Sequence, residues 1–91
     1  MLAIRTTSQF EKDVRRVLRR GLDLRRLRAV MDDLIQEKTL PSKLKDHKLT
    51  GEWKEHRECH IAPDWLLIYM IDRHEGLIVF VRTGSHSDLF R

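Results

Sequence analysis

The sequence contains few of the residues that cross-link or bend a polypeptide chain. It has one cysteine, two prolines and four glycines among its 91 residues. Because Cys59 is alone, it cannot form an internal disulfide, and this is typical of a protein kept in a reducing cytosol. The prolines and glycines are scattered singly, so we find no linker, internal repeat or low-complexity stretch.

Long hydrophobic runs are also missing. The longest one, Trp65 to Ile71, is far too short to span a bilayer as a helix. The chain turns polar at Arg5, so its N-terminus lacks the apolar core of a signal peptide. Hydrophobic residues still make up 41% of the sequence, which suits a folded protein. We therefore expect one domain over residues 1–91, located in the cytoplasm and without a membrane partner.

Positive charge, in contrast, is abundant. The sequence has 18 lysines and arginines against 14 acidic residues, a formal net charge of +4. Seven arginines lie close together: Arg15, Arg16, Arg19, Arg20, Arg25, Arg26 and Arg28. The planar guanidinium group suits phosphate, although such a run is also typical of the solvated face of a helix. Charge alone leaves nucleic acid, the ribosome and an acidic protein as possible partners.

Two amphipathic helices are predicted in the first half of the chain. Ser8 begins the first helix, and Glu11 three residues later completes a capping box. Gly21 ends this helix in a left-handed conformation. Asp23 is the N-cap of the second helix, whose apolar stripe ends near Lys38. Since only residues 21 to 23 join the two helices, we expect an antiparallel helical hairpin.

The remaining segments favour strands. Leu2 to Thr6 is predicted as a short opening strand, and residues 39 to 54 as an irregular basic loop. Three long antiparallel strands then follow: Glu55 to Ile61, Trp65 to Ile71 and Leu77 to Thr83. The predicted fold is therefore α+β, with an N-terminal strand and a helical hairpin packed on an antiparallel β-sheet.

A metal site is the first chemistry to consider, because His56, Cys59 and His60 are close in sequence. On a strand, His56 and His60 would be about 13 Å apart, too far to share one ion. Cys59 would point to the opposite face. A serine-nucleophile elbow and a glycine-rich phosphate loop are also missing from the sequence. We therefore expect neither a metal nor another cofactor.

A second possibility is the cleavage of RNA by its own 2′-hydroxyl. This reaction needs a base, an acid and a cation that stabilises the phosphorane. His86 follows the third long strand, and Arg82 lies near the end of that strand, on the face that carries Ile78 and Phe80. His60 ends an earlier strand, before the turn that contains Asp64. Taken alone, each of these residues is more simply interpreted as an ordinary surface side chain, so spacing alone does not make a site.

Three segments resemble a known family. They are Lys45 to Lys54 (KDHKLTGEWK), His60 to Tyr69 (HIAPDWLLIY) and Arg82 to Phe90 (RTGSHSDLF). In this order, they resemble the YafQ-type toxins of the RelE/ParE superfamily. The resemblance implies the toxin of a type II toxin–antitoxin module: a ribosome-dependent, metal-independent endoribonuclease, or mRNA interferase, that inhibits translation. It also implies a cognate antitoxin of the DinJ/RelB type, acidic and partly disordered, that blocks the site.

The resemblance assigns roles to individual residues. The residues that match the active-site cluster of the family are His47, His60, Asp64, Arg82 and His86. His86 is implied as the leading general acid or base, Arg82 as the group that stabilises the phosphorane, and Asp64 as an orienting carboxylate. His47 and His60 would share proton transfer or phosphate contact. The residues predicted to contact RNA are Phe90, Lys45, Arg19, Arg20, Arg25 and Arg26.

Two other functions stay open at this point. The chain could be a non-enzymatic toxin of the same fold that binds a topoisomerase, as in the ParE branch, since a fold alone does not define a function. It could also be a basic nucleic-acid-binding module that uses the arginine-rich helices. His56 and His74 match no motif, and we assign both to the surface. For Trp53 and Trp65, packing is favoured over base stacking.

Overall fold

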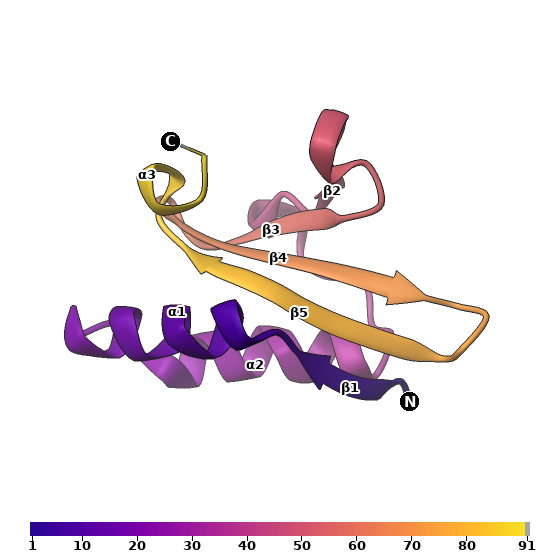
Figure 1. The fold of residues 1–91 in the computed structure, drawn as a ribbon. Helices are drawn as coiled ribbons and strands as arrows, with labels where there is room; N and C mark the ends of the chain where they lie inside the picture. Colours follow the sequence, from indigo (N-terminus) through magenta and orange to yellow (C-terminus); the bar gives the residue numbers. More distant parts are fainter. Residues whose placement is uncertain (91) are drawn as a thin grey trace.

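Residues 1–90, which the computed structural model describes, form a five-stranded sheet with helices on both faces (Figure 1). The strands lie in the order β1-β5-β4-β3-β2. Their bounds are Ala3–Thr6 for β1, His47–Lys48 for β2, Arg57–Ala62 for β3, Trp65–Asp72 for β4 and Leu77–Gly84 for β5. The helices are α1 (Ser8–Arg19), α2 (Leu24–Ile35) and α3 (His86–Leu89), with 3-10 turns η1 (Ser42–Leu44) and η2 (Gly51–Trp53).

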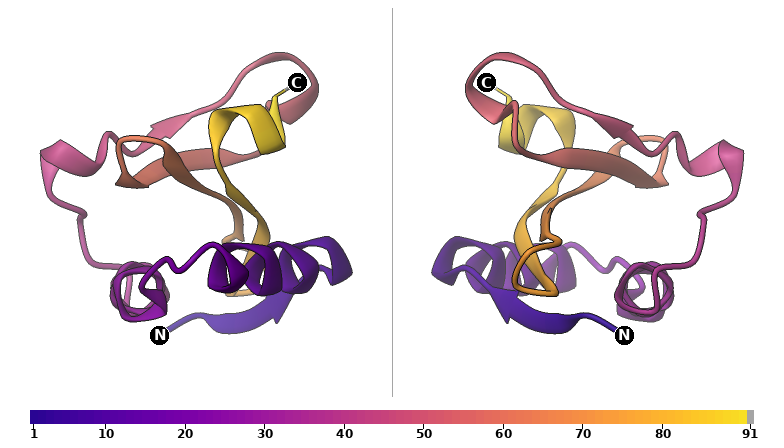
Figure 2. Two further views of the ribbon diagram at one scale, coloured as in Figure 1. Left: turned by 90° about the vertical axis from the view of Figure 1, so that its left-hand side faces the viewer. Right: turned by 90° about the vertical axis from the view of Figure 1, so that its right-hand side faces the viewer.

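The predicted α+β class is confirmed, and the layers are clear in two further views (Figure 2). The helices α1 and α2 cover one face of the twisted sheet, and the short α3 lies on the other. The sheet is not purely antiparallel, however. β1 pairs with β5 in the parallel direction, with Ile4 opposite Ile78, and the chain between them runs through both helices and then through β2, β3 and β4.

The helix boundaries follow from capping side chains. The predicted capping box at Ser8 is wrong: the N-cap of α1 is Thr7, whose Oγ1 accepts a hydrogen bond from the backbone N–H of Phe10 at 2.9 Å. The same hydroxyl donates to the carbonyl oxygen of Val81 at 2.8 Å, so the start of α1 is tied to β5. Gly21 (φ +82°) and the N-cap Asp23 act as predicted.

A two-residue strand lies inside the loop that was predicted to be irregular. In β2, His47 pairs with Glu58 and Lys48 with Arg57, in antiparallel register with β3. This polar strand is too short to show the alternation of polar and apolar residues by which a strand is recognised in sequence. The prediction for residues 39 to 54 is therefore wrong here. The pairing brings His47 onto the edge of the sheet.

Hydrophobic side chains fill both sides of β4. The main core lies between the sheet and the helices and includes Val17, Leu67 and Phe80. A smaller cluster of Leu66, Ile68 and Leu89 lies under α3 on the opposite face. β4 is therefore buried on both faces, which explains its unbroken apolar sequence. The packing role of Trp65 is confirmed, because it is buried in the main core and its Nε1 donates to the Thr83 hydroxyl at 3.0 Å.

A β-bulge in β5 changes the face of the sheet from which the Arg82 side chain projects. Ile68 pairs with Arg82 while the next residue, Tyr69, pairs with Phe80, so Val81 is the extra residue in β5. By this register Arg82 shares a face with Ile68 of the smaller cluster. The prediction that Arg82 lies on the face of Ile78 and Phe80 is wrong, because strict alternation does not continue through a bulge.

Candidate active site

The C-terminal helix α3 begins with a compact cap. The Ser85 hydroxyl accepts a hydrogen bond from the backbone N–H of Asp88 at 3.1 Å, and the Ser85 N–H donates to Asp88 Oδ2 at 2.9 Å. Gly84 precedes this cap, and a Cβ atom there would lie only 2.8 Å from Asp88 Oδ2. The Asp88 side chain thus fills the space that a side chain at position 84 would need. With Ser85 as the N-cap, His86 is the first residue of α3.

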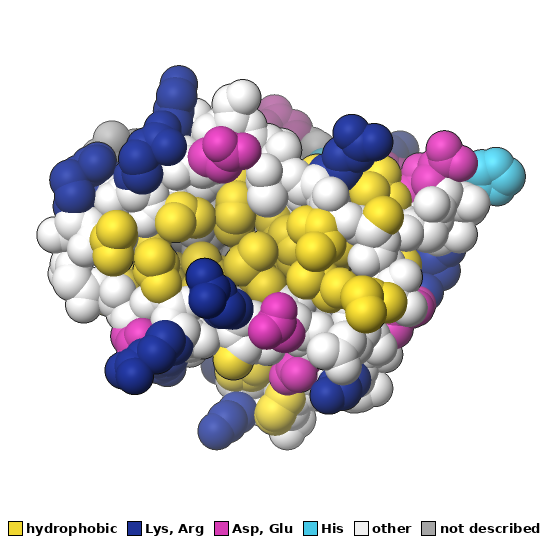
Figure 3. Space-filling model, turned by 90° about the horizontal axis from the view of Figure 1, so that it is seen from below, with side chains coloured by type: hydrophobic (Ala, Val, Ile, Leu, Met, Phe, Trp, Pro, Cys, Tyr) yellow, Lys and Arg dark blue, Asp and Glu magenta, His cyan; other side chains and the backbone are white. Residues whose placement is uncertain are grey.

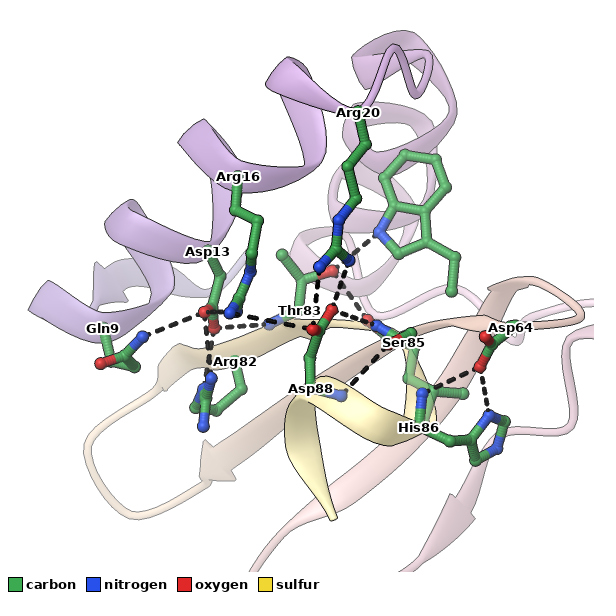
Figure 4. A network of polar contacts seen from close by, with 12 residues as sticks. Gln9, Asp13, Arg16, Arg20, Asp64, Arg82, Thr83, Ser85, His86 and Asp88 are labelled. Atoms are coloured by element: carbon green, nitrogen blue, oxygen red, sulfur yellow. Dashed lines mark hydrogen bonds and ion pairs between the residues drawn. The ribbon is translucent and has the colours of Figure 1, made fainter. Parts of the chain in front are cut away.

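Asp64, in the turn between β3 and β4, holds His86 by two contacts (Figure 4). Its Oδ1 accepts a hydrogen bond from the His86 backbone N–H at 2.9 Å and lies 2.6 Å from His86 Nδ1. These interactions, first that of the backbone N–H, lower the pKa of Asp64 below its ordinary value. The carboxylate therefore stays ionised and orients the imidazole, whose Nε2 points away from Asp64.

His60 is the next histidine in this region. Its ring centroid lies 5.8 Å from that of His86, with the two rings tilted by 46°. The strand register explains this proximity, because His60 pairs with Leu66 on β4, and Leu66 pairs with Gly84 on β5. Within residues 1–90 the buried Nδ1 atom of His60 has no hydrogen-bond partner. The structure therefore brings together three of the residues predicted for the site: His60, Asp64 and His86.

Arg82 is held by a carboxylate that the sequence interpretation missed. Its Nε and Nη2 donate to Asp13 of α1 at 2.8 and 3.0 Å. Asp13 is completely buried and also accepts hydrogen bonds from Arg16, from Gln9 and from the Thr83 backbone N–H. Its burial acts to raise its pKa, but the hydrogen bonds from Arg82, from Gln9 and from the Thr83 N–H outweigh the burial and the pKa is lowered. Asp13 is therefore ionised and orients Arg82.

A signal for Asp13 was present in the sequence. The residue lies three positions after Phe10 and four before Val17, so it interrupts the apolar stripe of α1. A carboxylate at a buried helix position requires a paired cation or several hydrogen-bond donors. Arg82, which comes from a strand 69 residues later, supplies that cation. The pairing itself depends on how α1 packs on β5, and sequence spacing does not reveal it.

His47 lies on the same sheet, but within residues 1–90 it forms no hydrogen bond, ion pair or ring contact with His86. Its Nε2 lies 3.8 Å from Glu58 Oε1, and its Nδ1 lies 2.6 Å from the Lys45 carbonyl oxygen. Glu58 is buried, and it precedes His60 by two residues on β3, so both share one face of the strand. After Asp13, Glu58 is the second carboxylate that the sequence did not predict for the site, and it lies beside His47 and His60.

An aromatic group borders the candidate site. Phe90 follows α3 and packs edge-on against Trp53, with ring centroids 6.3 Å apart, while 43% of Phe90 stays exposed. Trp53 also packs against His56 at 5.2 Å. The surface assignment of His56 is therefore wrong, because this ring is half-buried against an indole; that of His74 is confirmed. Trp53 is partly buried, as expected from a packing role.

Three of the four helix arginines predicted to contact RNA have partners within the protein. Arg20 forms a bidentate pair with Asp88 at 2.7 and 3.1 Å, and Arg25 pairs with its own N-cap, Asp23. Arg26 donates to the Ile61 carbonyl oxygen at 2.8 Å. Arg19 is exposed, with no hydrogen bond or ion pair in the described part of the chain. Exposed arginines alone therefore do not identify an RNA-contacting surface.

A basic pocket of about 330 Å³ adjoins His60. Its charged or titratable lining side chains are Arg26, Lys43, Lys45 and His60, without any carboxylate. The pocket lies where η1 crosses β3. Over residues 1–90 we find no group of three or more His, Cys, Asp or Glu side chains placed to hold a metal ion. The pocket chemistry therefore suits an anion such as phosphate.

The fold is that of a small bacterial toxin. A crystal structure of a metal-bound toxin from Helicobacter pylori is 46% identical, with a TM-score of 0.93 over 99% of this chain and 100% of that chain. The chain belongs to the YafQ family, described as bacterial toxins of type II toxin–antitoxin systems, whose model matches residues 2–91. The family resemblance predicted from the three motifs is thereby confirmed.

Two relatives from Escherichia coli add to this picture. The mRNA interferase toxin YafQ of strain K12 is 41% identical over 88 residues, which is 96% of this chain and 94% of that protein. A crystal structure of the E. coli DinJ–YafQ complex is 39% identical, with a TM-score of 0.91 and full coverage of both chains. The similarity therefore extends over the whole domain and not only over the motifs.

Proposed function

We propose that this YafQ-family toxin is an endoribonuclease that cuts mRNA on the ribosome, without a metal, and so inhibits translation. The observation that carries the proposal is the position of His86, which Asp64 holds at 2.6 Å beside the imidazole of His60. Two imidazoles at this separation can divide the work of an acid and a base near neutral pH. The activity of the E. coli relative, an mRNA interferase, supports the same chemistry.

The reaction consists of one displacement at phosphorus. One histidine of the pair accepts the proton of the 2′-hydroxyl as this oxygen bonds to the phosphorus atom, and the P–O5′ bond breaks. The other histidine donates a proton to the leaving 5′-oxygen. The products are a 2′,3′-cyclic phosphate, which can open to a 3′-phosphate, and a 5′-hydroxyl. His86 is the better placed of the two for proton transfer, because it is exposed and its Nε2 faces away from Asp64.

Arg82 stabilises the phosphorane in this scheme. Asp13 engages its Nε and Nη2 atoms, so Nη1 stays available for an oxygen of the reacting phosphate. A guanidinium that is already oriented needs no rearrangement as charge develops on the phosphate. The remaining predicted groups bind RNA: His47 and Lys45 the backbone, and the half-exposed Phe90 a base.

The partner that we propose is an acidic antitoxin related to DinJ. The E. coli relative has been crystallised with DinJ, and this chain offers a matching surface. Hydrophobic side chains gather in a band over α1, α2 and β1, with basic and acidic side chains at its margin (Figure 3). The band contains a groove of about 340 Å³ lined by Val14, Leu24 and Met31. An apolar patch with charged side chains at its rim suits an amphipathic segment of a partner.

The cytoplasm is the compartment that we propose, since the mRNA and ribosomes of a bacterium are there. Among residues 1–90, none of the helices has both the length and the apolar character required to cross a membrane. Cys59, the single cysteine, is buried in the main core, where burial raises the pKa of its thiol to about 12. A free buried thiol is compatible with a reducing compartment.

A cleavage assay on purified toxin tests the proposal. Model mRNA is incubated with the toxin and EDTA, with and without ribosomes, and the RNA ends are mapped. We expect cleavage in EDTA that depends on ribosomes and leaves cyclic phosphate and 5′-hydroxyl ends. His86→Ala should lower the rate by about 10²- to 10⁴-fold, the usual contribution of a general acid or base. His74→Ala, which alters an exposed turn, is the matched control.

Three outcomes would contradict the proposal. Full activity of His86→Ala would remove the assigned role of His86. Loss of cleavage in EDTA, restored by an added divalent ion, would contradict the metal-independent mechanism. This experiment is included because the similar Helicobacter pylori toxin was crystallised with a bound metal. DNA breaks on expression, with mRNA left intact, would instead indicate a toxin that acts on a topoisomerase.

A further inference from the structure

A continuous ionic network connects Arg82 to α3, the helix that carries His86 (Figure 4). It begins at Arg82, which is held by Asp13 of α1. Arg16, one helical turn later, contacts Asp13 and also reaches Asp88 of α3 with its Nη1 at 3.8 Å. Helix α1 is therefore the common support of Arg82 and of the helix that carries His86.

Arg20, the C-cap residue of α1, makes the shortest contact between this helix and α3. Its two terminal nitrogens donate to the two oxygens of Asp88 at 2.7 and 3.1 Å, a parallel arrangement that fixes direction as well as distance. Only 10% of the Asp88 side chain is exposed, against 47% for Arg20. The pair with Arg20 is the main cause that keeps the pKa of Asp88 well below its ordinary value. Asp88 is therefore ionised throughout the neutral range.

The helix α3 needs such support. It has four residues, and so short a helix is unstable unless tertiary contacts hold it. Its polar anchors lie on two sides: Asp64 holds His86 from the β3–β4 turn, and Arg20 holds Asp88 from α1. Leu89 adds the apolar contact beneath. Without Arg20, the anchor to α1 would consist only of the longer contact from Arg16.

We propose that Arg20 and Asp88 are positioning residues that hold α3 so that His86 stays beside His60. This inference rests on the proposed nuclease function and deepens it. It assigns Arg20 to the internal architecture of the site instead of the RNA-contacting surface expected from sequence. The geometry favours this role, because both terminal nitrogens of the guanidinium already donate hydrogen bonds to Asp88.

The two roles of Arg20 predict different kinetics. If Arg20 positions His86, Arg20→Gln should lower kcat about 10- to 100-fold and leave KM within about twofold, since misplacing a reacting group by an ångström has effects of this size. Arg20→Lys, which keeps the charge but not the bidentate geometry, should restore part of kcat. Arg15→Gln, on the same helix but exposed and without an ion pair in residues 1–90, is the matched control.

A double-mutant cycle identifies the partner. Asp88→Asn removes the charge while an asparagine can still accept the cap hydrogen bond from Ser85. Its effect on kcat should resemble that of Arg20→Gln, and the double variant should be no worse than either single one. Thermal unfolding of each variant establishes that the comparison is made on folded protein. Arg20 is half exposed, so we expect Arg20→Gln to fold.

An NMR measurement keeps this inference separate from the proposed function. Ring signals of His86 in the isolated toxin report the position of α3 whether or not RNA is cut. We expect them to shift or broaden in Arg20→Gln and to stay unchanged in Arg15→Gln. Unchanged His86 signals in Arg20→Gln would overturn the inference, as would a raised KM with normal kcat. If the wild-type toxin cuts no RNA, the proposed function fails, and these signals alone decide the positioning role.

Discussion

Arg82 and Asp13 form a bidentate ion pair between the bulged strand β5 and the first helix, with N–O distances of 2.8 and 3.0 Å. Asp13 is wholly buried, while the Arg82 side chain keeps 21% of its surface exposed. The pair therefore has one end in the core and the other partly exposed to solvent. This arrangement makes the orientation of a proposed catalytic cation depend on the packing of α1.

Removal of the Asp13 carboxylate should destabilise the fold. Asp13→Ala leaves Arg82 and Arg16 without their shared partner, and we expect the free energy of unfolding to fall by about 3 kcal/mol, the low end of the range for a broken buried pair, because both arginines still reach water. Urea unfolding at neutral pH measures this change. Asp32→Ala, at an exposed position of α2, is the control and should change stability by less than about 0.5 kcal/mol.

The same pair predicts how stability depends on pH. The pKa of Asp13 is lowered in the folded protein, so the unfolded chain binds the proton more readily. Its contribution is complete above the ordinary aspartate value near 3.8 and is lost as pH falls from there through the lowered pKa of the folded state. The stability difference between wild type and Asp13→Asn should therefore shrink on acidification. A difference that grew below pH 3.8 would contradict the assignment.

Asp64→Asn should lower cleavage without altering its dependence on substrate concentration. The amide can no longer serve as an ionised acceptor for His86 Nδ1, so part of the acid–base contribution is lost, about 10- to 100-fold in kcat. The pKa of Asp64 lies below the ordinary value, so the carboxylate is ionised throughout the neutral range. We therefore expect the loss at every pH between about 5 and 8. Glu75→Gln, in an exposed turn, is the control.

Arg19 is the helix arginine best placed to contact RNA, because it is exposed and lacks an internal partner in the described residues. Arg19→Gln should weaken binding to ribosomes or RNA and reduce the salt dependence of binding by about one phosphate contact. The rate at saturating substrate should stay unchanged. Binding titrations at several salt concentrations measure this effect. An unchanged salt slope would remove Arg19 from the contact surface.

Cys59 should be inert in the folded toxin. Burial is the main cause that raises the pKa of its thiol to about 12, so almost no thiolate exists at neutral pH, and thiolate is the form that alkylating reagents attack. Iodoacetamide should modify Cys59 only after denaturation, as detected by mass spectrometry. Rapid modification of native toxin would show that the core around β3 opens readily.

Much of the fold could be predicted because it depends on local signals. Asp23 and Gly21 mark helix ends through short-range backbone chemistry, and the apolar run of β4 reports a strand buried on both faces. The N-cap of α1 was misplaced by one residue, since Thr7 and Ser8 are chemically similar caps. Only the contact of Thr7 with Val81, 74 residues away, distinguishes them.

The candidate site was less accessible to such reasoning. The motifs indicated His86, Asp64 and His60, which the fold brings close together. Their supports could not be found, because Asp13 and Arg82 are 69 residues apart in sequence, and Arg20 and Asp88 are 68 apart. The bulge at Val81 was also invisible, since one extra residue leaves no mark in a strand that is apolar on both faces.

Gly84 has a consequence for genetics. A side chain at this position would meet Asp88 at 2.8 Å, and the backbone φ of +157° is one that side chains rarely adopt. Most substitutions of Gly84 should therefore tilt α3 and abolish the activity of the toxin, while the apolar groove over α1 and α2 stays intact. Among colonies that survive expression of the toxin without an antitoxin, mutations at this codon should be enriched.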